Sequence, residues 1–158
     1  NKKTKEMSEQ IDHDENAVSI HVRRGDYLEP KYWKTTGCVC QLPYYLNAIA
    51  EMNKRISQPS YYVFSDDIAW VKENLPLPKA FFIDWNKGAE SWQDMMLMSR
   101  CRHHIICNST FSWWGAWLNP RENKTVIMPE RWFRHCETPD ICPDKWIKVP
   151  INQPDSIQ

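Results

Sequence analysis

Glycine is scarce in this chain, with four residues among 158. So few glycines form neither the G-x-G-x-x-G turn of dinucleotide-binding proteins nor a phosphate-binding P-loop. The sequence also lacks an apolar run as long as a membrane span, so we expect a cytoplasmic protein or one peripheral at a membrane face. Any phosphate site in this chain must therefore be built without a glycine-rich loop.

An excess of one charge is also missing, because 20 Lys and Arg residues balance 20 Asp and Glu residues. This balance argues against non-specific nucleic-acid binding and against a polybasic membrane surface. Six cysteines are too few for a disulfide scaffold. Cys101 and Cys107 lie in apolar surroundings and are predicted to be buried free thiols, whereas a local disulfide or a zinc site remains open for the other four.

Two kinds of apolar segment alternate along the chain: short continuous runs, and longer stretches with apolar residues at helical spacing. Short β-branched or aromatic runs predict strands, and apolar residues at helical spacing predict the helices between them. The predicted strands are 17–22, 61–64, 80–84, 104–107 and 125–128, and the predicted helices are 43–56, 67–74, 89–101 and 111–118. This order is typical of an α/β fold with a doubly wound, mainly parallel sheet. We expect residues 1–16 to be a linker or an irregular edge, 17–158 to be one domain, and the tail from Pro129 to be largely irregular.

Polar residues follow the first four predicted strands. His21 and Arg23 end the first, Asp66 follows the second, Asp84 ends the third, and Asn108, Ser109 and Thr110 follow the fourth. The carboxyl ends of parallel strands share one edge, where ligands bind. Arg23 is a cationic fork suited to phosphate, and a helix beginning near Thr110 adds a positive dipole end, with Ser109, Thr110 and Ser112 orienting.

Structural roles are also compatible with the same residues. Arg23 can pair with Asp26 or Asp66, and Arg24 falls on the other face of the strand with Asp26 two positions away. His21 is either a buried core histidine or a contact to a base or ribose. Asp94 lies inside a predicted helix, where a solvated face would explain it. Three tryptophans at helical spacing favour core packing over sugar stacking: Trp113, Trp114 and Trp117.

Two segments resemble a known family. His-Val-Arg-Arg-Gly-Asp-Tyr at 21–27 and Asn-Ser-Thr-Phe-Ser-Trp-Trp-Gly-Ala-Trp at 108–117 are similar to signatures of the α-1,2-fucosyltransferases, glycosyltransferase family 11. The resemblance runs from about residue 18 to about residue 128. It implies the Rossmann-like, GDP-fucose-binding half of a two-domain GT-B glycosyltransferase, in residues 17–158. The acceptor-binding half has no counterpart before Ala17, and the chain opens on Asn1, so we expect a piece of a longer protein with little turnover alone.

The resemblance further implies transfer of L-fucose from GDP-fucose to a hydroxyl of a galactose-terminated glycan. The linkage would be α-1,2, with inversion and without a metal or other cofactor. Arg23 would stabilise charge on the β-phosphate, and Asp94 would pair with the guanine edge. Asp26 and Glu29 are candidate bases, although Asp26 can instead hold Arg24. The donor-binding residues implied are His21, Arg23, Arg24, Asp94, Asn108, Ser109, Thr110, Phe111 and Ser112.

Two other functions are compatible with the residues. Asp66, Asp67 and Asp84 resemble the carboxylates that hold a metal in metal-dependent nucleotide-sugar transferases. Helix capping also explains Asp66 or Asp67. Alternatively, the polar edge belongs to a non-catalytic module that binds a phosphate or a nucleotide.

Overall fold

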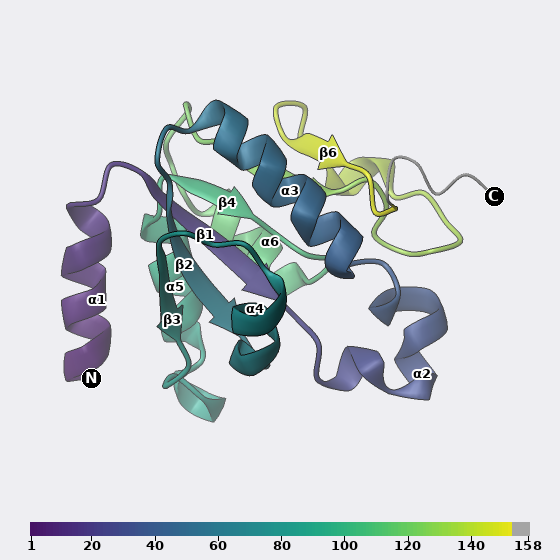
Figure 1. Cartoon of the computed structure of the whole chain (residues 1–158), viewed down its shortest axis with the longest axis horizontal. Helices are drawn as coiled ribbons and strands as arrows, with labels where there is room; N and C mark the ends of the chain where they lie inside the picture. The colour runs from purple at the N-terminus through teal and green to yellow at the C-terminus, as the bar shows by residue number, and fades with distance from the viewer. Residues whose placement is uncertain (153–158) are drawn as a thin grey trace.

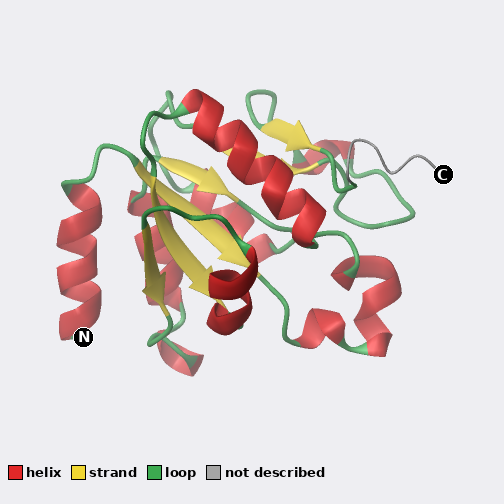
Figure 2. Cartoon of the chain, in the orientation of Figure 1, coloured by secondary structure: helices red, strands yellow, loops and turns green. Residues whose placement is uncertain are grey.

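The chain folds around one six-stranded sheet with the order β3-β2-β1-β4-β5-β6. The computed structural model describes residues 1–152, and every strand pair in this part is parallel. Figure 1 shows the sheet, and Figure 2 shows helices on both of its faces. The strands are β1 (Ala17–Val22), β2 (Ser60–Ser65), β3 (Ala80–Ile83), β4 (His103–Ile105), β5 (Val126–Pro129) and β6 (Ile147–Val149). The predicted doubly wound α/β fold is confirmed.

The helices divide between the two faces of the sheet. Val18, Ile20 and Val22 pack in one hydrophobic cluster with residues of α3 and α4. Ala17 packs on the opposite face with residues of α1 and α5. The helices are α1 (Lys2–Asp12), α2 (Pro30–Tyr32), α3 (Leu42–Arg55), α4 (Ile68–Asn74), α5 (Trp92–Arg100) and α6 (Thr110–Trp117). Short turns of helix lie at η1 (Asp26–Leu28), η2 (Trp33–Gly37), η3 (Gly88–Glu90) and η4 (Pro139–Ile141).

The direction of winding reverses at β1. The chain runs outward from β1 to β2 and β3, then crosses the sheet to continue with β4, β5 and β6. Because β1 and β4 are neighbours whose connections leave in opposite directions, the carboxyl edge of the sheet beside them is where ligands bind in folds of this kind. The sequence predicts the polar residues at this same edge.

Residues 1–16 differ from the expectation of a linker, because residues 2–12 form helix α1. Thr4 and Ile11 are buried, and α1 packs against α5. Arg100 also donates two hydrogen bonds of 2.9 Å to the Asp12 carboxylate. The inward-facing side of the helix, formed by Thr4, Met7 and Ile11, has too few apolar residues to stand out in a polar sequence, and tertiary packing stabilises the helix.

The tail is more regular than predicted. Ile147–Val149 pairs with β5 as a sixth parallel strand. Trp132 and Trp146 pack with residues of α6 and β5 in a third cluster. Trp113 joins this cluster as predicted, whereas Trp114 and Trp117 leave 47% and 50% of their surfaces exposed.

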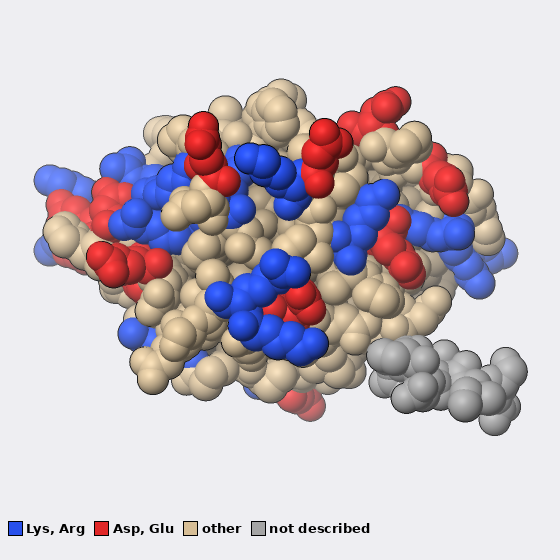
Figure 3. All heavy atoms as spheres, turned by 90° about the horizontal axis from the view of Figure 1, so that it is seen from above, with Lys and Arg blue, Asp and Glu red and all other residues tan. Residues whose placement is uncertain are grey.

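The mixed surface charge and the free cysteines agree with what the amino-acid composition predicts. The face in Figure 3 carries interspersed basic and acidic side chains. All six cysteines are free, and Cys101 and Cys107 are buried as predicted. Within residues 1–152, none of the helices has the length and apolar character needed to cross a bilayer.

Candidate functional site

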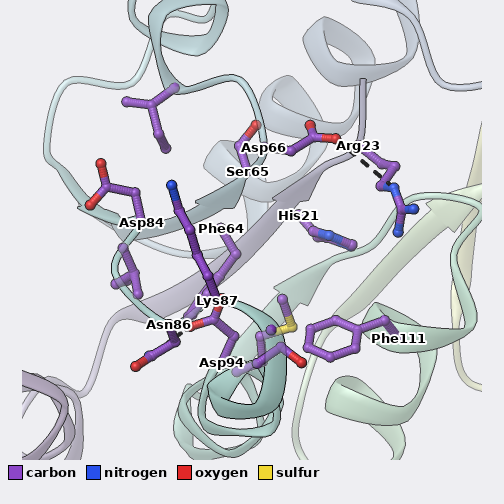
Figure 4. Close-up of a pocket in the computed structure, with 15 residues that line it drawn as sticks. His21, Arg23, Phe64, Ser65, Asp66, Asp84, Asn86, Lys87, Asp94 and Phe111 are labelled. Carbon is purple, nitrogen blue, oxygen red and sulfur yellow. Dashed lines mark hydrogen bonds and ion pairs between the residues drawn. The ribbon is translucent and has the colours of Figure 1, made fainter. Parts of the chain in front are cut away.

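A pocket of about 640 Å³ lies beyond the carboxyl ends of β1, β2 and β3, beside α5 and the first turn of α6. Figure 4 shows how its side chains converge from these separate elements. Its lining residues are His21, Arg23, Phe64, Ser65, Asp66, Ile68, Ile83, Asp84, Asn86, Lys87, Gly88, Ser91, Asp94, Met98 and Phe111. Four of the predicted site residues meet here: His21, Arg23, Asp94 and Phe111.

Arg23 is held at the pocket by acidic neighbours. Its Nε and Nη2 atoms donate to the Asp26 carboxylate at 3.1–3.2 Å, and its Nε lies 4.0 Å from Asp66 Oδ2. The guanidinium also lies 5.1 Å from the centre of the Tyr27 ring. These contacts use one side of the fork, and 36% of the side chain remains exposed. Arg23 therefore forms an ion pair with Asp26 and also lines the pocket.

Asp66 fixes the turn that follows β1. Its two carboxylate oxygens accept from the backbone N–H groups of Arg24 and Gly25 at 2.9 and 2.8 Å. A Cβ atom at Gly25 would lie 2.5 Å from Asp66 Oδ2, so a side chain at this position would displace the Asp66 carboxylate. The role of Asp66 in this structure is to orient the backbone beside Arg23.

Arg24 lies outside the pocket lining, although it was a predicted donor-binding residue. Its guanidinium stacks 4.1 Å from the Trp70 ring centre, its Nε lies 3.5 Å from Asp67 Oδ2, and only 14% of the side chain is exposed. Asp67 also accepts from the backbone N–H of Trp70 as the N-cap of α4. Strand alternation sends Arg24 to the α4 side, where it packs structurally.

His21 forms a neutral wall of the pocket. It is 9% exposed, its Nδ1 lies 3.4 Å from Cys107 Sγ, and its ring centre lies 5.8 Å from that of Phe111. Burial, with a smaller contribution from Arg23, lowers the pKa of His21 to about 3. The imidazole is therefore uncharged at neutral pH and suits hydrogen bonding or packing against a ring.

Asp94 places a half-buried carboxyl at the other end of the pocket. Burial raises its pKa to about 6, and a hydrogen bond from Asn86 Nδ2 to Asp94 Oδ1 at 2.9 Å opposes that rise. The solvated helix face considered from sequence does not describe Asp94, because it lines the pocket. A carboxylate that is costly to ionise, in a cleft, is typical of a functional position.

We expect Asp94→Asn to stabilise the fold at pH 7. Because the folded-state pKa is raised, folded protein binds the proton more tightly, and the contribution of Asp94 to stability falls as pH rises from about 4 to about 6. Thermal unfolding should give a higher Tm for Asp94→Asn than for wild type at pH 7, with the gap narrowing toward pH 4. Asp144→Asn, at an exposed position, is the matched control. Equal Tm values at pH 7 would contradict this account of Asp94.

Most residues of the segment 108–112 lie outside the lining of the pocket, and several of them make structural hydrogen bonds beside it. Asn108 is buried, and its Nδ2 donates to the carbonyls of Thr36 and Trp132 at 2.9 and 3.0 Å. Ser109 is the N-cap residue of α6 but makes no side-chain cap hydrogen bond. Ser112 is buried and donates back to the Ser109 carbonyl, while Thr110 is exposed. Of these predicted residues, Phe111 contributes its ring to the lining.

Sequence reasoning missed the segment after β3. Asn86, Lys87 and Gly88 all line the pocket, and Figure 4 shows the Lys87 side chain running across it. Gly88 has φ +58°, a left-handed conformation that favours glycine and turns the chain into η3. The rule that polar residues collect after parallel strands would have found them if it had been extended beyond Asp84.

The comparisons with known proteins agree with these features. The profile of "Glycosyl transferase family 11" matches residues 1–149. An alpha-1,2-colitosyltransferase of Escherichia coli is 38% identical over 138 residues, covering 85% of this chain and 48% of that protein. The O-antigen biosynthesis glycosyltransferase WbnK of Escherichia coli is 37% identical over 135 residues, covering 85% and 45%.

A third relative aligns with a shorter part of the chain. The galactoside alpha-(1,2)-fucosyltransferase 1 of Saimiri boliviensis boliviensis is 35% identical over 105 residues, covering 64% of this chain and 28% of that protein. The chain thus spans less than half the length of these relatives. The match nonetheless includes the strands, the pocket and both signature segments, and the chain belongs to glycosyltransferase family 11.

Proposed function

We propose that this chain is the donor-binding part of an enzyme that transfers L-fucose from GDP-fucose to a hydroxyl of a galactose-terminated glycan. The linkage is α-1,2, the reaction inverts the anomeric centre, and no metal takes part. The observation that carries the proposal is the polarity of the pocket. A guanidinium, Arg23, lies at one end and the Asp94 carboxyl at the other, as Figure 4 shows. A nucleoside diphosphate presents complementary groups, anionic at the phosphates and donor-rich at the guanine edge.

Arg23 is the residue proposed to stabilise the leaving group. In the transfer, the acceptor oxygen forms a bond to fucose C1 while the bond from C1 to the β-phosphate oxygen breaks. Negative charge then grows on the β-phosphate, and a prearranged guanidinium lowers the energy of that charge. The side of the Arg23 fork not used by Asp26 or Asp66 is available for it. Lys87, which lines the same pocket, supplies a second cation.

Asp26 is better suited to hold Arg23 than to act as the general base. Both of its carboxylate oxygens accept from Arg23 Nη2 at 3.1 Å. These bonds direct the Asp26 carboxylate at the guanidinium of Arg23, and its role in this proposal is to hold that side chain. We therefore place the general base in the remainder of the full-length enzyme, which we propose precedes Asn1 and carries the acceptor site. Residues 17–158 form the donor domain in this scheme, with α1 packed against it.

The first turn of α6 is the proposed cradle for the diphosphate. Its first N–H groups carry the positive end of the helix dipole, and the Ser109 side chain does not cap them. Asn108 and Ser112 fix this turn through their own hydrogen bonds. The role of these residues is to present backbone donors, whereas Arg23 provides the formal charge.

Nucleotide titration of the isolated chain tests the proposal. Calorimetry should detect weak binding of GDP and weaker binding of UDP, and EDTA should leave the GDP affinity unchanged. Fucosyl transfer by the isolated chain is expected to be negligible. Equal affinity for both nucleotides would favour a non-catalytic phosphate-binding module. Loss of binding in EDTA would favour a metal site at Asp66, Asp67 and Asp84, although Asp66 and Asp67 already bind backbone N–H groups.

The donor sugar needs its own measurement. One relative is named for colitosyl transfer and another for fucosyl transfer. Competition between GDP-fucose and other GDP-linked deoxysugars for the isolated chain would rank the sugars that the pocket accepts.

A further inference from the structure

Two buried polar side chains link helix α1 to Asp94. Thr4 is 4% exposed and Asn86 is 5% exposed. Thr4 Oγ1 donates to Asn86 Oδ1 at 3.0 Å, and Asn86 Nδ2 donates to Asp94 Oδ1 at 2.9 Å. The three residues come from α1, the segment after β3, and α5, so the fold alone brings them together. Thr4 lies outside the lining of the pocket.

The hydrogen bonds that link Thr4, Asn86 and Asp94 run in one direction, from donor to acceptor. Trp85 Nε1 donates to Thr4 Oγ1 at 3.0 Å, and an indole nitrogen only donates. The Thr4 hydroxyl therefore accepts from Trp85, and its own hydrogen points to Asn86 Oδ1. Asn1 Nδ2 also donates to that oxygen, at 3.4 Å. With Oδ1 occupied as an acceptor, the NH₂ group of Asn86 faces Asp94 as a donor.

This direction determines what Asp94 offers to a ligand. The Asn86 amide donates to one acceptor position of Asp94 Oδ1 and thereby restrains the rotation of the carboxyl plane. The remaining acceptor positions then face the pocket in one orientation. A guanine edge presents N1–H and N2–H₂ side by side, and it meets both carboxylate oxygens only when the two planes are aligned.

We propose that Thr4 and Asn86 are positioning residues, which orient Asp94 and thereby set the base selectivity of the pocket. The inference rests on the proposed function, in which Asp94 contacts guanine. It assigns to helix α1, remote from the pocket lining, a part in nucleotide recognition.

The selectivity between GDP and IDP measures this orientation. Hypoxanthine keeps N1–H but lacks the N2 amino group, so the ratio of the two Kd values reports the second hydrogen bond. Thr4→Val keeps the shape of the side chain and removes the hydroxyl. Because one hydrogen bond is involved, we expect the preference for GDP over IDP to fall by roughly three- to tenfold.

Two further variants separate positioning from loss of packing. Thr4→Ser keeps the hydroxyl and should retain the wild-type preference. Ile11→Val removes one buried methylene from the same helix without touching the hydrogen bonds, and it should also retain the preference. If Ile11→Val lowers the preference as much as Thr4→Val, or if Thr4→Val leaves it unchanged, the inference is overturned.

A second readout needs no nucleotide. In the ligand-free chain, the side-chain amide resonances of Asn86 should shift in Thr4→Val and stay near their wild-type positions in Thr4→Ser. Failure of the wild-type chain to bind GDP would defeat the proposed donor alone. The link from Thr4 to Asn86 would then be supported or overturned by these resonances, and unmoved resonances in Thr4→Val would overturn it.

Discussion

Replacing Arg23 with lysine is expected to weaken GDP binding by about 10- to 100-fold. Lysine keeps the positive charge but loses the planar fork, so the variant isolates the geometry of the guanidinium. A charge-assisted hydrogen bond contributes roughly 1.5–3 kcal/mol, and the fork is expected to lose at least one such bond to the diphosphate. Calorimetric titration with GDP measures the loss.

Arg55→Lys is the matched control for Arg23→Lys. Arg55 lies at the end of α3 and pairs with Glu51 at 2.9 Å, away from the pocket lining. Its replacement should leave the GDP affinity within twofold, roughly, as for most surface substitutions. An unchanged affinity in Arg23→Lys would remove Arg23 from the phosphate site and leave the Asp26 ion pair as its whole role.

Replacing Asp94 with asparagine should reverse the base preference of the pocket. Guanine offers two adjacent donors to the carboxylate, and an asparagine amide presents a donor where an acceptor is needed. A mismatched buried polar pair costs the full desolvation penalty, so GDP affinity should fall by about 30- to 100-fold. Xanthine carries a carbonyl in place of the guanine amino group, so the variant should bind xanthosine diphosphate better than GDP.

The control for the reversal is the affinity for UDP. Uridine lacks the guanine edge, so Asp94→Asn should change UDP binding little, which separates base recognition from damage to the diphosphate site. The variant is also expected to be more stable than wild type at pH 7, so weaker binding would not reflect unfolding. Equal losses for GDP and UDP would show that Asp94 does not recognise the base.

The secondary structure of the central domain could be predicted because its apolar residues recur at clear strand or helix spacing. All five predicted strands and all four predicted helices are present, with small differences at their ends. The misses share a physical cause. Helix α1 is mostly polar and strand β6 is only three residues long, so neither shows a clear apolar period, and each forms because it packs on or pairs with a neighbouring element.

The candidate site was predictable to a different degree at each residue. Strand alternation and the edge rule predict that His21 and Arg23 reach this edge of the sheet, and both line the pocket. Arg24 was assigned with them, but the same alternation sends its side chain to Trp70. Lys87 was missed because one cation after a strand carries no local signal of the pocket it crosses.

The α/β class, the polar edge and the family resemblance are evident from the amino acids alone, because strand periodicity and the two signature segments are local properties of the chain. Which polar side chains meet depends on how the chain folds. The contacts of Arg23 with Asp66, of Asn86 with Asp94, and of Thr4 with Asn86 join elements distant in sequence. Such pairings depend on the strand order and on helix packing, which the spacing of residues along one chain does not specify.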